Sequence, residues 1–253
     1  MARYQIIVSY DGTNFYGSQR QGLKRTVQGE LEKALTRIGW AGKSILMAGR
    51  TDTGVHASGQ VAAFDLDWNH ELFRLLKAIN SHLPEDLVVR QISPVAASFH
   101  PRFDAVSRTY RFCLFNSGIR DPLRERYAWR VWPEVIGLIP VADLWIGEHD
   151  FSSYGSPTSE KGSTIRHVSR CGWKQCGDEW SFEIEADAFL YRMVRRLVYV
   201  QVAAAQGRVD VGDLRTALDG AGKQRAEAKR NLPAGLAAPC GLSLVQVQYD
   251  NRD

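Results

Sequence analysis

The sequence predicts an α+β fold of two ferredoxin-like (β-α-β-β-α-β) halves, with a mostly antiparallel sheet flanked by helices. Two observations predict this class. Short segments rich in Val, Ile and aromatic residues occur among longer segments whose apolar residues recur at helical spacing. These segments follow the order strand, helix, strand, strand, helix, strand, and the order then recurs. The letters of the two passes do not match, so the repetition is one of architecture only.

The first half is expected over residues 1–105. RYQIIVSY (3–10) is rich in β-branched and aromatic residues and ends at Asp11-Gly12, which predicts a buried strand followed by a turn. Thr26 stands just before a segment with apolar residues on one helical face, so it predicts the start of a helix over 26–35. The other elements expected here are strands 43–49, 60–68 and 86–95, and a helix over 70–83 that Pro84 ends.

The second half is expected over residues 106–253. EWSFEIEADAF (179–189) alternates in polarity and predicts a strand that pairs with 166–175 across a turn at Gly177-Asp178. A helix is expected over 133–147, although Pro140 would kink or break it. The other expected elements are strands 107–117 and 241–249, a helix over 190–205, long loops over 117–132 and 148–165, and an irregular stretch over 220–238.

The composition is that of a soluble globular protein. Hydrophobic residues make up 44% of the 253 residues, yet no run approaches the roughly 20 apolar residues that a membrane span requires. MARYQIIVSYDG at the N-terminus has only a short apolar run before a turn, so we expect a first strand rather than a signal peptide, and hence a cytoplasmic location. The scattered cysteines favour reduced thiols over a zinc site; they are Cys113, Cys171, Cys176 and Cys240.

The net charge of +4 and the pI of about 8.9 are mild, but the basic residues are clustered. Several clusters are interleaved with aromatic residues, a pattern that suits RNA because phosphates attract cations and bases stack on rings. The alternative is a set of solvated surface patches, and composition does not choose between the two. The clusters are Arg20, Lys24, Arg25; Arg102, Arg108, Arg111; Arg120, Arg124, Arg126, Arg130; Arg192, Arg195, Arg196; and Arg225, Lys229, Arg230.

The segment AGRTDTGVHASG (48–59) contains Asp-Thr-Gly, the three letters that carry the catalytic aspartate of aspartic proteases. Such a protease needs two carboxylates that share a proton, whereas this chain has one copy, with an Arg two residues earlier that favours an ionised Asp52. A protease is therefore not expected. Asp52 is either a turn residue, with Gly49 and Gly54 giving the backbone its freedom, or a catalytic carboxylate presented by a rigid loop.

The stretch GRTDTGVHA (49–57) resembles the signature of the tRNA pseudouridine synthase A family. Further blocks that resemble the same family occur in order along the chain, so the resemblance covers nearly all of it. These blocks are YDGTNFYGSQRQ (10–21), TVQGELE (26–32), FHPRF (99–103), RTYRF (108–112), GEHDFSS (147–153), AFLYRMVR (188–195) and APCGLSL (238–244).

The resemblance implies a reaction that breaks the bond between uracil N1 and ribose C1′ and joins C1′ to uracil C5. Asp52 would be the essential nucleophile, which either attacks the base at C6 or acts at the ribose through a glycal. Tyr110 would stack on the target base, and Arg195 would pair with Asp52 and keep it ionised. Arg50 would help to hold the flipped nucleotide. The active cleft would lie between the two halves.

Without the resemblance, the same residues have plainer interpretations. Tyr110 can be an ordinary strand residue, and Arg195 can belong to a solvated stripe on a helix. His56 is more readily a structural loop residue than a ligand, and His149 beside two acids does not form a set of ligands around one metal. No residue pattern in the sequence indicates a nucleotide, flavin or metal cofactor, and neither G-x-x-x-x-G-K-[ST] nor G-x-G-x-x-G occurs, so we expect no cofactor.

The resemblance also implies partners and a target. The substrate would be tRNA, modified at uridines 38, 39 and 40 of the anticodon stem-loop and lying across both subunits of a homodimer, with no membrane and no metal involved. Two rival classes are a non-catalytic RNA-binding protein of the same fold and a hydrolase, such as a nucleosidase that releases uracil. Three residues depart from the family pattern: Ser18 stands where Trp is expected, Arg196 where Asn is usual, and Tyr199 where Gly is usual.

Overall fold

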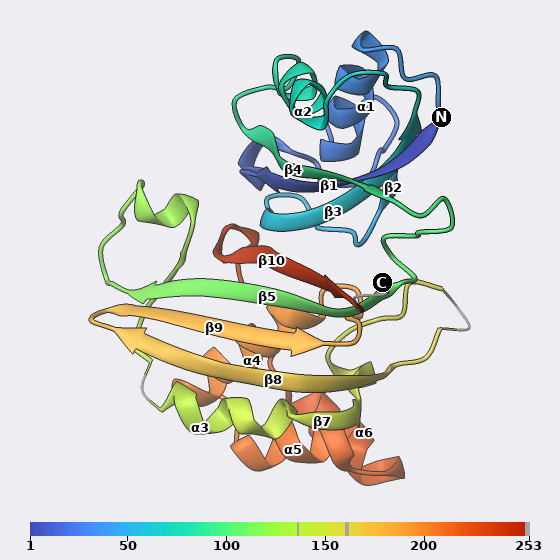
Figure 1. Cartoon of the computed structure of the whole chain (residues 1–253). Coiled ribbons are helices and arrows are strands. Elements are labelled where there is room, and N and C mark those ends of the chain that lie inside the picture. Colours follow the sequence, from blue (N-terminus) through green and yellow to red (C-terminus); the bar gives the residue numbers. More distant parts are fainter. Residues whose placement is uncertain (136, 160–161, 251–253) are drawn as a thin grey trace. The chain divides into compact units, whose positions relative to one another are not determined.

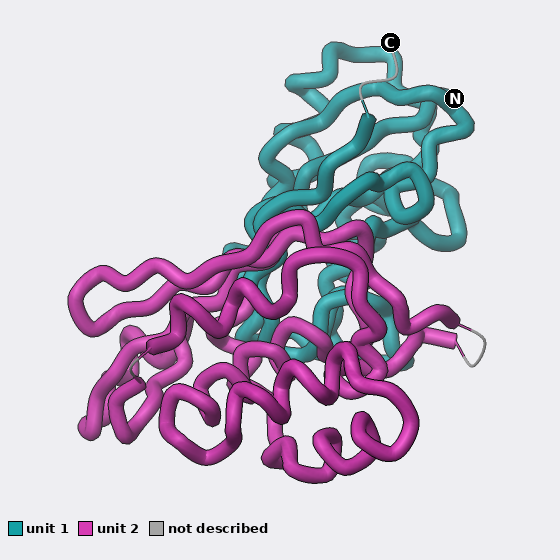
Figure 2. Tube along the Cα trace, turned by 90° about the horizontal axis from the view of Figure 1, so that it is seen from below, with its two compact units in different colours: residues 1–108, 243–253 teal, residues 109–242 magenta. Residues whose placement is uncertain are grey.

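The computed structural model describes residues 1–135, 137–159 and 162–250. Its contacts divide the chain into two units (Figure 2): unit 1 comprises residues 1–108 and 243–253, and unit 2 comprises residues 109–242. The last strand of the chain therefore groups with the N-terminal unit. The domain division at residue 105 stays a prediction, because contacts group segments without showing which of them fold on their own.

Unit 1 is built on the antiparallel strand order β4-β1-β3, made by β1 (Ala2–Tyr10), β3 (His56–Leu66) and β4 (Leu87–Val95). The two-residue β2 (Leu46–Met47) pairs antiparallel with β3 at Ala62 and Ala63. The strand β10 (Leu242–Tyr249) runs parallel to the opposite end of β3, where Ser243 lies across from His56. The predicted strand-helix-strand-strand-helix-strand order is confirmed, with β2 much shorter than expected.

The helices α1 (Val27–Arg37) and α2 (Leu72–Asn80) lie on one side of these strands (Figure 1). The predicted start of α1 is confirmed, because the hydroxyl of Thr26 accepts a hydrogen bond of 3.2 Å from the backbone N–H of Gly29. The apolar face is also confirmed. It is fully buried at Val27, Leu31, Ala34 and Leu35.

Unit 2 has the strand order β5-β9-β8-β7. The predicted hairpin is confirmed: Cys176 lies across from Glu179, and Gly177 makes the turn with a left-handed φ of 60°, which glycine adopts at little cost. The expected face of the second hairpin strand is buried at Trp180, Phe182, Ile184 and Ala186. The strands are β5 (Ala105–Asn116), β6 (Trp129–Val131), β7 (Gly147–Asp150), β8 (Ile165–Cys176) and β9 (Glu179–Ala186).

The described residues of unit 2 also form the helices α3 (Leu138–Ala142), α4 (Met193–Ala205), α5 (Val211–Asp219) and α6 (Gly222–Asn231) (Figure 1). The helix predicted over 133–147 is shortened to α3 and a following 3-10 turn, Asp143–Trp145, and residue 136 lies outside the described residues. Pro140 is the third residue of α3. It causes no break there, because the first turn of a helix needs no backbone N–H.

The helix predicted from residue 190 begins later, at Met193. Tyr191 is held out of the helix by two backbone hydrogen bonds with Ser156, and Arg192 takes a left-handed φ of 63° at the cap position. The prediction of an irregular stretch over 220–238 is partly wrong, since α6 occupies most of its first half. The Ala, Lys, Arg, Gln and Glu residues of α6 favour a helix, and its Ala228 is buried.

The predicted fold class, α+β with mostly antiparallel strands flanked by helices, is confirmed. Two expected loops contain regular structure: β6 lies within 117–132, and β7 occupies the start of 148–165, whose residues 160 and 161 are outside the described part. In the part of the chain that the structure describes, no helix has both the length and the apolar character needed to cross a membrane.

Replacement of Gly59 by Ala tests the close approach of β10 to β3. An added Cβ would lie 2.2 Å from the carbonyl oxygen of Val245, a backbone atom that cannot move without displacing β10. We expect Gly59→Ala to destabilise the protein by about 1–3 kcal/mol in urea unfolding, as overpacking does. Gly172→Ala is the matched control, since its Cβ on β8 would meet nothing within 4 Å. Equal stability of the two variants would contradict the expectation.

Candidate active site

Asp52 lies in the turn between β2 and β3 and is half-buried. The backbone N–H of Val55 donates to the carbonyl of Asp52 at 3.1 Å and closes the turn. Gly54 has a left-handed φ of 78°, a conformation that glycine favours and side chains resist. The turn therefore has a defined shape, and the side chain of Asp52 projects from a fixed backbone position.

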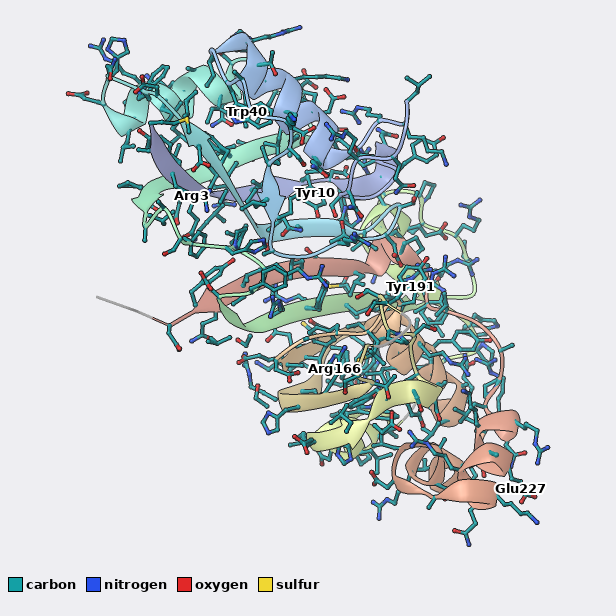
Figure 3. All side chains as sticks on the ribbon, turned by 90° about the vertical axis from the view of Figure 1, so that its right-hand side faces the viewer. Arg3, Tyr10, Trp40, Arg166, Tyr191 and Glu227 are labelled. Carbon is teal, nitrogen blue, oxygen red and sulfur yellow. The ribbon has the colours of Figure 1, made fainter. Side chains whose placement is uncertain are left out.

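The segment that follows β1 holds this turn through Thr51, the residue directly before Asp52. The N–H of Ser18 donates to the carbonyl of Thr51 at 3.1 Å, and the N–H of Thr51 donates to the hydroxyl of Ser18 at 2.8 Å. The two hydroxyls of Tyr10 and Thr51 lie 2.8 Å apart and share a further hydrogen bond; Tyr10 is labelled in Figure 3. The side chains of Ser18 and Thr51 are buried, so these hydrogen bonds are shielded from water.

Two glycines allow the backbones of the two segments to touch. A Cβ at Gly12 would lie only 2.0 Å from the carbonyl oxygen of Val55, and one at Gly17 would lie 2.7 Å from that of Thr51. The N–H of Gly12 also donates to His56 Nδ1 at 3.0 Å. His56 thus contacts the backbone in the way that its structural interpretation predicts. The first sequence block and the Asp52 turn form one packed piece.

Arg50 lies two residues before Asp52, with its side chain exposed. Its backbone is anchored from the neighbouring residue, because the amide of Gln60 donates to the carbonyl of Gly49 at 3.0 Å. A guanidinium exposed in this way is available to bind a phosphate group.

Tyr110 and Arg195 both belong to unit 2. Tyr110 is half-buried on β5 and meets the ring of Phe189 edge to face, with ring centroids 5.0 Å apart and planes at 84°. Phe189 lies in the segment just before α4, in a block that resembles the family, yet the sequence assigned it no role. Its contact limits the orientations that the Tyr110 ring can take.

Arg195 lies in the first turn of α4 and is oriented by the backbone of Ala237. Its Nε donates to the carbonyl of Ala237 at 2.8 Å, and the N–H of Ala237 donates back to the carbonyl of Arg195 at 3.1 Å. Nothing in the sequence pointed to Ala237, because it lies 42 residues further along the chain. Asp52 and Arg50 thus lie in unit 1, whereas Tyr110 and Arg195 lie in unit 2, and their meeting in one cleft stays a prediction.

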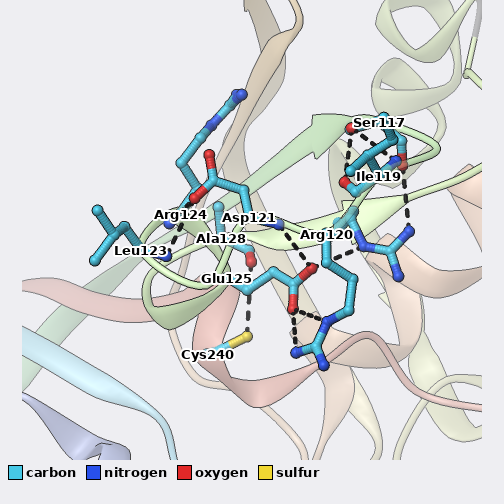
Figure 4. Close-up of polar contacts among 10 residues, drawn as sticks. Ser117, Ile119, Arg120, Asp121, Leu123, Arg124, Glu125, Ala128 and Cys240 are labelled. Carbon is cyan, nitrogen blue, oxygen red and sulfur yellow. Dashed lines mark hydrogen bonds and ion pairs between the residues drawn. The ribbon is translucent and has the colours of Figure 1, made fainter.

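The arginine cluster of the 117–132 segment is used largely within the fold (Figure 4). Glu125 accepts hydrogen bonds from Arg120 at 2.7 Å and from Arg130 at 2.8 Å, and the bond from Arg120 is the largest cause that lowers the pKa of Glu125 to about 2. Arg124 binds both carboxylate oxygens of Asp178. Arg120, Arg124 and Arg130 therefore each bind a carboxylate of the same unit.

Within the described residues, no three His, Cys, Asp or Glu side chains gather in a way that would hold a metal ion. His149 instead contacts Asp219 at 2.7 Å and the carbonyl of Ile146 at 2.9 Å, which ties β7 to the end of α5.

Ser18→Ala tests the hold on the Asp52 turn. The change removes the acceptor of the buried Thr51 N–H, so we expect a loss of about 1–3 kcal/mol in unfolding free energy and faster hydrogen exchange at that amide. The exposed Ser58 on β3 supplies the control, since Ser58→Ala should stay within about 0.5 kcal/mol of the parent. Unchanged exchange at Thr51 in Ser18→Ala would show that the turn keeps its shape without this contact.

The pH dependence of stability tests the burial of Tyr10. Burial raises the pKa of the Tyr10 hydroxyl to about 12, against the opposing hydrogen bonds from Thr51 and Gln60. In the unfolded chain a tyrosine hydroxyl ionises at about pH 10, so the folded state binds this proton more tightly than the unfolded state does. The resulting contribution to the free energy of unfolding is fully present below about pH 10 and is lost as the pH rises towards 12. In urea unfolding from pH 8 to 11, Tyr10→Phe should lose stability with pH less steeply than the parent.

Tyr16→Phe is the control for this measurement, because Tyr16 is half exposed. We expect it to follow the parent across the same pH range. Parallel curves for the parent and Tyr10→Phe would contradict the assigned burial effect.

Comparison with known proteins agrees with the resemblance seen in the sequence. The chain matches the model of a family described as tRNA pseudouridine synthase over residues 6–104 and 141–250, which include Arg50, Asp52 and Arg195, with Tyr110 in the stretch between them. It is 42% identical over 207 residues to tRNA pseudouridine synthase A of Dechloromonas aromatica, covering 81% of this chain and 79% of that one.

Two further relatives carry the same name and match over nearly the full length. The protein of Brevibacillus brevis is 36% identical over 252 residues, covering 98% of this chain and 100% of that one. The protein of Pseudothermotoga lettingae is 39% identical over 256 residues, with the same coverage. On these matches, the chain belongs to the tRNA pseudouridine synthase family.

Proposed function

We propose that this chain is an isomerase that converts uridine to pseudouridine at positions 38, 39 and 40 of the tRNA anticodon stem-loop, with Asp52 as the nucleophile. One observation carries the proposal: in a chain of this family, the turn that presents Asp52 is held on both sides of that residue. The Tyr10–Ser18 region contacts Thr51 before Asp52 and Val55 after it. A catalytic carboxylate benefits from such fastening, because the cost of positioning it is met during folding rather than during the reaction.

The reaction is an isomerisation, so the substrate and the product have the same composition. The bond between N1 and C1′ breaks, the base turns, and C1′ bonds to C5; the proton on C5 leaves and N1 takes up a proton. Asp52 supplies the carboxylate, either at C6 of the base or at the ribose. The uridine must first leave its stack, which costs a few kcal/mol. The balance of this reaction calls for no oxidant, reductant or transferred group.

The other three residues receive roles that suit their surroundings. Tyr110 stacks on the target base, and its contact with Phe189 keeps the ring from turning freely. Arg195 pairs with Asp52 and keeps it ionised, with its guanidinium oriented through Nε. Arg50 contacts the sugar-phosphate of the flipped nucleotide from its exposed position beside Asp52.

The proposal extends to partners and place. The substrate is tRNA, bound by a homodimer, and the enzyme acts in the cytoplasm. The four cysteines all lie within the described residues and are free thiols, which suits a reducing compartment. The relatives named tRNA pseudouridine synthase A support the substrate class.

The decisive experiment uses an unmodified tRNA transcript that has uridines at 38, 39 and 40, tritiated at C5. The native chain should release tritium and leave pseudouridine at those positions, whereas Asp52→Asn should lower the rate by at least about 10³-fold, as loss of a catalytic group does. The exposed Asp67 supplies a matched control, and Asp67→Asn should react like the parent. Binding of tRNA is measured in parallel by filter retention.

Each other outcome points elsewhere. Binding by the native chain without tritium release would favour the non-catalytic RNA-binding protein. Release of free uracil would favour a nucleosidase. Pseudouridine at positions outside 38–40 would support the assignment as a pseudouridine synthase and change the assigned target positions.

A further inference from the structure

The segment that follows α6 is fastened to α4 by Arg196. Its Nη1 donates to the carbonyl of Pro233 at 2.5 Å and to that of Gly235 at 3.1 Å. Arg196 is half-buried, and this burial lowers the pKa of its guanidinium. A guanidinium placed there loses part of its hydration. The charge-assisted hydrogen bonds to the two backbone carbonyls offset part of the free energy that this loss costs.

Tyr199, one turn further along α4, covers the same segment. A Cβ on Gly235 would lie 2.4 Å from the ring of Tyr199, so the ring packs directly against the glycine backbone, whose φ is 139°. The ring of Tyr199 is also stacked with that of Trp129, with ring centroids 6.3 Å apart and planes at 20°. The guanidinium of Arg196 also lies 5.9 Å from the centre of this ring. The two residues that depart from the family pattern on α4 therefore share one contact surface.

Two residues beyond Gly235, the same segment supplies the carbonyl that orients Arg195. Ala237 is fully buried and exchanges two hydrogen bonds with Arg195, one to its Nε and one from the Ala237 N–H to its backbone carbonyl. A shift of the segment would carry this carbonyl with it. The direction of the Arg195 guanidinium thus depends on where Arg196 and Tyr199 hold the chain at 233–235.

We propose that Arg196, together with Tyr199, is a positioning device for Arg195: it fastens the 233–237 segment so that the carbonyl of Ala237 aims the Arg195 guanidinium. This proposal rests on the role given to Arg195 under the proposed function. Arg196 itself touches no reacting atom, and its effect on the reaction passes through Arg195 alone.

A double-mutant cycle tests the proposal with the tRNA transcript described above. We expect Arg196→Ala to lower kcat about 10- to 100-fold with little change in KM, as a small misplacement of a catalytic group does. Arg195→Ala should lower kcat further. The double variant should match Arg195→Ala, because Arg196 has nothing left to position. Additive losses, or a change confined to KM, would overturn the proposal.

Matched variants separate positioning from general damage. Arg208 also places its guanidinium near the Tyr199 ring, at 5.6 Å, while its Nε binds Gln206. Arg208→Ala should therefore keep kcat within about two-fold of the parent. Tyr199→Phe keeps the ring and should keep the rate, whereas Tyr199→Ala should behave like Arg196→Ala. Loss of kcat in Arg208→Ala equal to that in Arg196→Ala would count against a specific role.

A second measurement needs no activity. The Nε–H of Arg195 should exchange slowly with water in the parent by NMR, with its signal identified by its absence in Arg195→Lys. In Arg196→Ala this exchange should be at least about ten-fold faster, since the Ala237 carbonyl is no longer fixed. Unchanged exchange of the Arg195 Nε–H in Arg196→Ala would overturn the positioning role, whether or not the native chain forms pseudouridine. Failure of the native chain to form pseudouridine, with faster exchange in Arg196→Ala, would overturn only the proposed function.

Discussion

The approach of the Gly12 backbone to the carbonyl of Val55 is the constraint on which the candidate site depends. A side chain at residue 12 would have to occupy the position of that carbonyl, 2.0 Å away, so the contact requires glycine. The same approach brings Ser18 against Thr51 and lets their backbones pair. Several residues of the sequence block over 10–21 therefore contact the Asp52 turn and shape it.

In unit 2, neighbouring groups of the fold orient the candidate residues. Arg195 is oriented by a neutral carbonyl, and Tyr110 by an aromatic edge. A carbonyl fixes a guanidinium in direction without cancelling its charge, whereas a carboxylate at the same place would do both. Orientation by a neutral group therefore leaves the charge of the guanidinium in place.

The sequence predicted those parts of the fold whose signals are local. Alternation gave the buried face of β9, and Thr26 marked the start of α1. The α6 helix was missed because Gly220 and Pro233 at the ends of the stretch outweighed the helix-forming residues between them. In the site, the resemblance supplied Asp52, but its hydrogen-bonded supports join residues more than 30 positions apart. Such contacts depend on tertiary packing, which no local pattern encodes.

The arginines show the same limit in electrostatic form. In the 117–132 segment, Arg120 and Arg130 converge on Glu125, and Arg124 reaches Asp178 on the β8–β9 hairpin turn. A guanidinium presents several donors in a fixed plane, so it can join two strands or two loops in a way that lysine does less well. A cluster of arginines in a sequence is therefore evidence for internal fastening as much as for RNA. The distinction depends on the carboxylates and carbonyls that folding brings within reach.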